Sequence, residues 1–361
     1  MKRGPLQLVS AATLAGALAG CAPSPRLTNN TPPLILSPIV NAGLTDGRGR
    51  FRETLCAIDA VRGYYRERSC NSLLHRLNGE PPPTGKAVAL NHSRVKLRIR
   101  VVPGIFGECA EDMATPFLDA VRPEPGKGYD LGQFGFDVAA FRVPGRSSSR
   151  HNAEQLRAQI AAMTLKPDER LVLIGHSKGM SDLIELIGGD RSVVPRGSSI
   201  VSLTGVVAGT PIADAGNDAY RILRKLPLPN CPAGDGGGVT SLTRQTRLNY
   251  LAEHPLPDDL HYFSIAAYTR SANISSGLKP THAALSKIDA RNDGNVIFTD
   301  SIIPGSTVLG YLDADHWAVA MPFEVYAPRR ARLFASRNHF PRVVLLEAIA
   351  RIVAETYEPT L

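Results

Sequence analysis

A short apolar run that leads directly into a glycine-flanked serine is the strongest constraint on the fold of this 361-residue chain. The run occupies residues 171–174 (Leu-Val-Leu-Ile), the turn 175–179 (Gly-His-Ser-Lys-Gly), and a helical pattern continues to residue 187. Four consecutive apolar residues are typical of a strand buried on both faces of a parallel sheet. The sequence therefore predicts a central strand, a tight turn and a helix, with Ser177 in the turn.

The turn fits the pattern G-x-S-x-G, in which glycines permit a tight bend that raises the serine hydroxyl above the sheet edge. The N-terminus of the following helix would stabilise negative charge that develops during attack by that hydroxyl. The pattern is common by chance, but its place between strand and helix favours a catalytic nucleophile. We expect His176 to pack or to line a pocket. Lys178 would either attract an anionic substrate group or lie in solvent.

Strand and helix patterns alternate along much of the chain. Further strands are predicted at 95–102, 136–143, 200–207, 262–267 and 308–312, and helices at 151–164 and 337–358. This alternation predicts an α/β domain with a mostly parallel sheet. Residues 211–259 do not fit this alternation, because they contain several prolines and a run of three glycines. We therefore expect a lid or cap insertion there.

These features resemble an α/β-hydrolase of the bacterial lipase and esterase kind, over roughly residues 90–325. The stretch 101–107, Val-Val-Pro-Gly-Ile-Phe-Gly, is similar to the family's oxyanion loop, where many members have His-Gly instead of Pro-Gly. The resemblance implies an α/β-hydrolase fold with a lid, and an oxyanion hole made by the backbone N–H groups of Ile105 and Lys178. It also implies hydrolysis of carboxylic esters through an acyl-enzyme, without a cofactor.

A serine nucleophile needs a base, and the base needs an orienting carboxylate. The family's order is serine, acid, histidine, and it makes His316 the expected base because His316 follows the strand pattern 308–312. His254, His261 and His339 fit that setting less well. Residues 291–296, Arg-Asn-Asp-Gly-Asn-Val, resemble the turn that carries the acid in many lipases, so Asp293 is the expected acid.

Three other carboxylates compete with that acid. Asp315 adjoins His316, and neighbouring side chains in extended backbone point to opposite sides. Asp313 would need a tight turn to reach the imidazole, and Asp289 lies before the acid turn. A calcium loop that starts at Asp289 is disfavoured because Arg291 takes its third ligand position. We expect no metal site.

The N-terminus has the layout of a secretory signal. A basic start precedes the small, apolar stretch 6–19, which is too short to span a bilayer. Residues 18–21, Leu-Ala-Gly-Cys, resemble the bacterial lipoprotein box, which implies a signal peptide at 1–20 and lipidation of Cys21. By the same resemblance to Gram-negative lipoproteins, Ala22 in place of aspartate favours sorting to the outer membrane. We expect a flexible tether over 21–50, rich in proline, and the hydrolase domain over 51–361.

Export explains the remaining cysteines, because disulfides form in oxidising compartments. Cys56 and Cys70 lie in a helical stretch that is predicted from residue 51, and Cys109 and Cys231 follow. Four cysteines allow three pairings. Our hypothesis is Cys56–Cys70, which closes a local loop, and Cys109–Cys231, which would join the lid to the oxyanion loop.

The formal net charge is +8, but the basic residues are scattered and are not interleaved with aromatic residues, so we expect no nucleic-acid partner. The expected partners are an ester or lipid-like substrate and, through the anchor, the cell envelope. Two alternatives to hydrolysis remain. One is acyl transfer by the same residues, and the other is an inactive envelope lipoprotein of the same fold.

Overall fold

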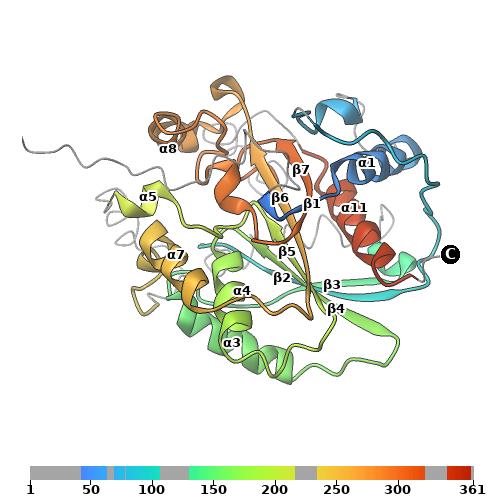
Figure 1. The fold of residues 1–361 in the computed structure, drawn as a ribbon, viewed down its shortest axis with the longest axis horizontal. Helices are drawn as coiled ribbons and strands as arrows, with labels where there is room; N and C mark the ends of the chain where they lie inside the picture. Colours follow the sequence, from blue (N-terminus) through green and yellow to red (C-terminus); the bar gives the residue numbers. More distant parts are fainter. Residues whose placement is uncertain are drawn as a thin grey trace, which may run out of the picture. The chain divides into compact units, whose positions relative to one another are not determined.

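One parallel sheet organises the protein. The computed structural model describes residues 42–62, 69–77, 79–105, 130–215, 234–321 and 340–358, which belong to one compact unit. Within them, seven strands pair in the order β1-β7-β6-β5-β4-β2-β3, and every neighbouring pair is parallel (Figure 1). The strands are β1 Thr45–Asp46, β2 Lys96–Val102, β3 Phe136–Ala140, β4 Glu169–His176, β5 Ser199–Leu203, β6 His261–Tyr268 and β7 Thr307–Asp313. The predicted α/β domain with a parallel sheet is confirmed.

Helices cover both faces of the sheet. Successive side chains of a strand point to opposite faces, and β4 follows this rule. Val172 and Ile174 pack in the core beneath α1 (Arg48–Arg62) and α11 (Arg342–Glu355). Leu171 and Leu173 pack against α3 (Ser149–Ala161) and α4 (Lys178–Gly188) on the other face (Figure 1). The central apolar run is therefore buried on both sides, as its composition predicts.

The domain begins before residue 51. Thr45 and Asp46 form β1, which pairs with β7, and α1 begins at Arg48. The Asp46 carboxylate accepts hydrogen bonds from the Arg48 amide and guanidinium, at 2.7–3.2 Å. The tether predicted over 21–50 therefore does not extend through residues 45–50. A strand of two residues is too short to leave a periodic pattern, which explains the error.

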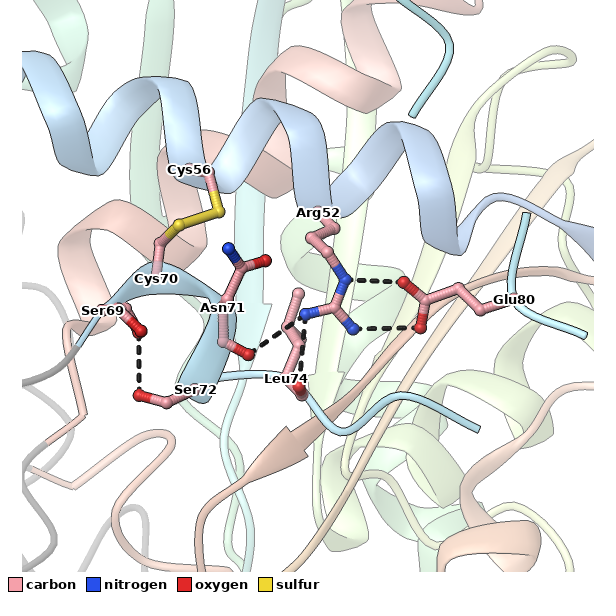
Figure 2. The surroundings of a disulfide bond; sticks show 8 residues. All are labelled: Arg52, Cys56, Ser69, Cys70, Asn71, Ser72, Leu74 and Glu80. Carbon is pink, nitrogen blue, oxygen red and sulfur yellow. Dashed lines mark hydrogen bonds and ion pairs between the residues drawn. A yellow bond between two sulfur atoms is a disulfide. The ribbon is translucent and has the colours of Figure 1, made fainter. Parts of the chain in front are cut away.

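The predicted Cys56–Cys70 disulfide is present (Figure 2). Cys56 lies on α1, which ends at Arg62, whereas Cys70 begins a 3₁₀ helix, Cys70–Ser72. The helix predicted from residue 51 therefore does not include Cys70. Cys109, Cys231, Cys21 and the predicted signal peptide all lie outside the described residues. Among the described helices, none has the length and apolar character needed to cross a membrane.

Shorter helices follow the strand ends on the carboxyl side of the sheet. They are α5 (Pro211–Asp214), α7 (Arg244–Glu253) and α8 (Lys279–Leu285). In an open parallel sheet the carboxyl ends of the strands form the usual ligand-binding edge. The loops after β4 and β7, which contain Ser177 and His316, meet at this edge.

Candidate active site

Ser177 lies in a strained turn between β4 and α4. Its backbone has φ 55° and ψ −129°, a conformation that is costly for a residue with a Cβ and is typical of functional sites. The neighbouring glycines are required by space. A Cβ at Gly175 would lie 2.5 Å from the Met180 Cα, and one at Gly179 would lie 2.1 Å from the Val102 carbonyl oxygen. The turn therefore has the geometry that the G-x-S-x-G pattern predicts.

His316 and Asp293 form a buried pair. The His316 Nδ1 atom lies 2.7 Å from the Asp293 Oδ2 atom. The other carboxylate oxygen of Asp293 accepts hydrogen bonds from the amides of Asn295, at 2.8 Å, and Val296, at 2.7 Å. Backbone donors and the imidazole thus hold the carboxylate in one orientation, so Asp293 can orient the His316 ring.

A cavity of about 390 Å³ connects this pair to the serine. Ser177 and His316 both line it, and the His316 Nε2 atom is buried without a hydrogen-bond partner among the described residues. Most of the lining is apolar: Gly104, Ile105, His176, Ser177, Val206, Thr210, Ile212, Ala213, Val239, Leu242, Gly277, Leu278, Pro280, Thr281, Asn295, His316, Trp317 and Met321. The free ring nitrogen therefore lies in the wall of the same cavity as the serine.

The predicted oxyanion loop lies against the serine. A Cβ on Gly104 would be 2.7 Å from the Ser177 Cβ and 3.0 Å from its Oγ, so only glycine allows this approach. Ile105, the next residue, lines the cavity. The loop therefore passes directly beside the nucleophile. Ile105 directly follows Gly104 in this loop, and Lys178 directly follows Ser177.

The sequence predicted that the Lys178 side chain would attract an anionic substrate group or lie in solvent, and both predictions are wrong. It is fully buried, and its ammonium lies 2.6 Å from the Asp182 Oδ1 atom. The second oxygen of Asp182 accepts a hydrogen bond of 2.8 Å from the Asn152 Nδ2 atom on α3. The lysine is therefore neither in solvent nor in the cavity. The spacing of four residues places both charges on one face of α4, which this packing buries.

His176 packs on the candidate base, in agreement with its expected role. The His176 and His316 ring centroids are 4.9 Å apart, with an interplanar angle of 33°. The His176 Nε2 atom lies 3.3 Å from the His316 carbonyl oxygen. Burial, and secondarily the nearby His316 ring, lower the pKa of His176 to about 3. His176 is therefore neutral near pH 7.

The competing carboxylates have other partners. Asp289 forms an ion pair with Arg291 at 3.0 Å, and Asp313 accepts a hydrogen bond of 2.6 Å from the Thr269 hydroxyl. Asp315 accepts hydrogen bonds from the Ser275 amide and hydroxyl, at 2.7 and 2.6 Å. No group of three His, Cys, Asp or Glu side chains that could hold a metal occurs within the described part of the chain.

The other candidate bases are also placed away from this arrangement. His254 stacks on Tyr250 at the end of α7, and His261 begins β6. His339 lies outside the described residues. His316 is thus the candidate whose ring meets a carboxylate and lines the cavity of Ser177.

The segment predicted as a lid contributes to the cavity wall. Ile212, Val239 and Leu242 come from this segment and line the cavity. Arg244, at the start of α7, forms a buried ion pair with Asp300 of the main domain. The sequence did not identify the lining residues Gly277, Leu278, Pro280, Thr281 and Trp317. The only local signal was that Trp317 adjoins the candidate base.

No family model matches the chain, and no curated protein matches it. Among solved structures, the metagenomic carboxyl esterase MGS0156 is 39% identical, with a TM-score of 0.79, over 90% of this chain and 97% of that one. This chain belongs to the same carboxyl esterase family, which has the α/β-hydrolase fold. The lipase BlEst2 of Bacillus licheniformis, in its propeptide form, is 18% identical, with a TM-score of 0.50, over 70% of this chain and 54% of that one. That likeness concerns the fold alone. The predicted α/β-hydrolase fold is confirmed.

Proposed function

We propose that this member of the carboxyl esterase family hydrolyses carboxylic esters through an acyl-enzyme formed on Ser177. The observation that carries the proposal is the His316–Asp293 pair. Its unpartnered Nε2 atom lines the same cavity as the serine. A base held by a carboxylate beside a serine in a strained turn is the arrangement that activates a hydroxyl.

In the first half of the reaction, the Ser177 Oγ atom attacks the ester carbonyl carbon while its proton moves to the His316 Nε2 atom. The Ile105 and Lys178 amides bind the resulting oxyanion. When the tetrahedral intermediate collapses, the alcohol leaves with the proton from Nε2, and the acyl group remains on Ser177.

In the second half, Nε2 takes a proton from water as the water oxygen attacks the acyl carbon. Collapse of the second intermediate returns that proton to Ser177 and releases the carboxylic acid. Asp293 stays ionised throughout and stabilises the imidazolium. Each step uses side chains and amides of this chain.

The test compares the purified protein with its Ser177→Ala variant on p-nitrophenyl esters of graded acyl length. We expect the variant to lose activity by about 10⁴-fold or more, because the three residues act as a unit. A fluorophosphonate should label the unaltered protein and not the variant. Retention of a tenth of the activity by Ser177→Ala would disprove the assignment, and absence of labelling in the unaltered protein would favour an inactive protein of the same fold.

We also propose that the protein is exported and is held at the cell envelope through a lipid on Cys21. Support comes from the sequence at residues 1–21, which has a basic start, a short apolar run and Leu-Ala-Gly-Cys. The several acyl chains of a bacterial lipoprotein anchor a protein far more firmly than one chain does. This location would place the esterase near lipid-like substrates.

A further inference from the structure

Residues 69–77, here called the strap, lie along the edge of the sheet at the end of β7. The Leu73 carbonyl oxygen accepts a hydrogen bond of 2.9 Å from the Asp313 amide, and the His75 amide donates one of 2.8 Å to the Tyr311 carbonyl. Leu74 forms an antiparallel bridge with Leu312 between them. The strap therefore pairs with the last residues of the strand that leads to His316.

Two links attach the strap to α1 (Figure 2). The Cys56–Cys70 disulfide fixes its beginning. One helical turn before Cys56, the buried Arg52 guanidinium binds the carbonyl oxygens of Asn71, Leu74 and His75 at 3.2–3.3 Å. It also binds both carboxylate oxygens of Glu80, at 2.6 and 3.0 Å. All five N–H groups of the guanidinium are used, so the strap has a defined position relative to α1.

The His75 side chain joins the ends of two strands. Its ring stacks on Tyr268, with centroids 3.9 Å apart and an interplanar angle of 8°. Its Nε2 atom lies 2.8 Å from the Tyr268 carbonyl oxygen, which can only accept, so Nε2 donates. The same atom lies 3.5 Å from the Asp313 Oδ1 atom. Tyr268 and Asp313 are partners in the register of β6 and β7.

His316, the proposed base, follows Asp313 of this junction with two residues between them. On the far side, Asp315 is held by Ser275 and the His316 amide donates to the Asp293 carbonyl oxygen at 2.9 Å. On the near side, β7 is held by the strap and by His75. A displacement of β7 at Asp313 would therefore be transmitted to the His316 ring.

We propose that His75 is a positioning residue for His316, and that the disulfide-anchored strap holds it in place for this purpose. The proposal rests on the proposed function, because His316 acts there as the base. Misplacement of a catalytic group by about 1 Å can cost about 100-fold in rate. The strap therefore contributes to turnover in addition to covering the edge of the sheet.

The chain offers a spectroscopic reporter and a matched control. Trp317 is the chain's single tryptophan and directly follows His316, so its fluorescence reports on this loop. His254 is half-buried and stacks on Tyr250 with the same interplanar angle of 8°, and its Nδ1 atom lies 3.1 Å from the Tyr250 carbonyl oxygen. It is an equivalent histidine–tyrosine stack on α7, away from β7.

The experiment compares His75→Ala, His75→Gln, His254→Ala and the double variant Cys56→Ser/Cys70→Ser in the full chain. We expect His75→Ala to lower kcat between about tenfold and about 100-fold, with KM within about twofold, because ground-state binding is unchanged. Trp317 emission should move to longer wavelength, with stronger quenching by acrylamide.

The other variants test the cause of this change. His75→Gln retains an N–H donor and should recover most of the lost kcat. The double cysteine variant should change in the same direction as His75→Ala, and His254→Ala should retain normal kcat and Trp317 emission.

Two results would overturn the proposal. One is a His75→Ala protein with a lower melting temperature but unaltered kcat and Trp317 emission, which would make the strap a stabilising element only. The other is an equal loss of kcat in His254→Ala. If the unaltered protein hydrolyses no ester, the Trp317 readout still tests the position of the loop, so failure of the proposed function is distinguishable from failure of this inference.

Discussion

His316 and Asp293 are joined twice, once through their side chains and once through their backbones. The His316 Nδ1 atom lies 2.7 Å from the Asp293 Oδ2 atom, and the His316 amide donates to the Asp293 carbonyl oxygen at 2.9 Å. An ionised carboxylate only accepts hydrogen bonds, so Nδ1 carries the proton of the neutral ring. The Nε2 atom then has the lone pair that a general base needs.

Replacing Asp293 by asparagine should lower kcat by about 10⁴-fold, because an amide NH₂ group would favour the opposite imidazole tautomer, as in the serine-protease precedent. Asp289→Asn is the matched control, since Asp289 pairs with Arg291. The kcat of Asp289→Asn should stay within a few-fold of that of the unaltered protein. Steady-state kinetics on a p-nitrophenyl ester measure both. If Asp289→Asn were the inactive variant, the acid would be misplaced by one turn.

Local sequence signals predicted the strand–turn–helix arrangement around Ser177. The turn at Ser177 combines an apolar strand, two glycines and a helix, and each of these produces a recognisable pattern within a few residues of the sequence. His316 and Asp293 lie 23 residues apart and meet in a hydrogen bond. Their predicted roles came from resemblance and chain order. The geometry now brings them together.

Features that depend on long-range packing were not predictable. Lys178 is charged and follows the nucleophile, so the sequence favoured solvent or substrate for its side chain. Only the packing of α3 and α4 shows that Asp182 and Asn152 enclose it. The strap was missed for the same reason, because its pairing with β7 joins residues more than 200 positions apart.

The buried Lys178–Asp182 pair leads to a stability prediction. Lys178→Met leaves the Asp182 carboxylate buried without its cation, which typically costs about 3–5 kcal/mol. The double variant Lys178→Met/Asp182→Leu removes both charges but leaves the buried Asn152 amide without its acceptor, so it should recover only part of that loss. Urea unfolding of the three proteins measures the difference. A single variant within about 1 kcal/mol of the unaltered protein would show that the pair is not important for stability.

Loss of the Cys56–Cys70 disulfide should destabilise the domain. Its sequence separation is 14 residues, and cross-linking a loop of about that length is worth roughly 3 kcal/mol in the chain-entropy model. The Cys56→Ser/Cys70→Ser variant should unfold at correspondingly lower urea concentration. Non-reducing peptide mapping of the unaltered protein checks the pairing, and a Cys56–Cys109 peptide would contradict it.

The lipid anchor is tested by Cys21→Ser. Because acylation requires the cysteine thiol, the variant should remain unprocessed and take up almost no radioactive palmitate when it is expressed in a Gram-negative host. The unaltered protein should be labelled and should fractionate with the outer membrane. Replacing Ser24 by alanine, close to the same site, is the control and should leave labelling intact. Equal labelling of Cys21→Ser would exclude lipidation at this residue.

His176 should make the folded protein sensitive to acid. Its pKa is about 3 in the folded protein, mainly because it is buried, against an ordinary value of 6.5. Between these two pKa values, His176 binds a proton in the unfolded chain but not in the folded one. The contribution of the neutral ring to the free energy of unfolding is therefore complete above pH 6.5 and is lost as pH falls towards 3. At pH 5 the loss amounts to about 2 kcal/mol.

Urea unfolding at pH 7 and at pH 5 measures this loss. Between the two pH values, the free energy of unfolding of His176→Gln, whose side chain does not titrate, should fall by about 2 kcal/mol less than that of the unaltered protein. His92→Gln, at an exposed histidine, should decline as the unaltered protein does. An identical decline in His176→Gln and the unaltered protein would mean that another group takes up the proton, and the neutral ring packed on His316 would then have no part in acid unfolding.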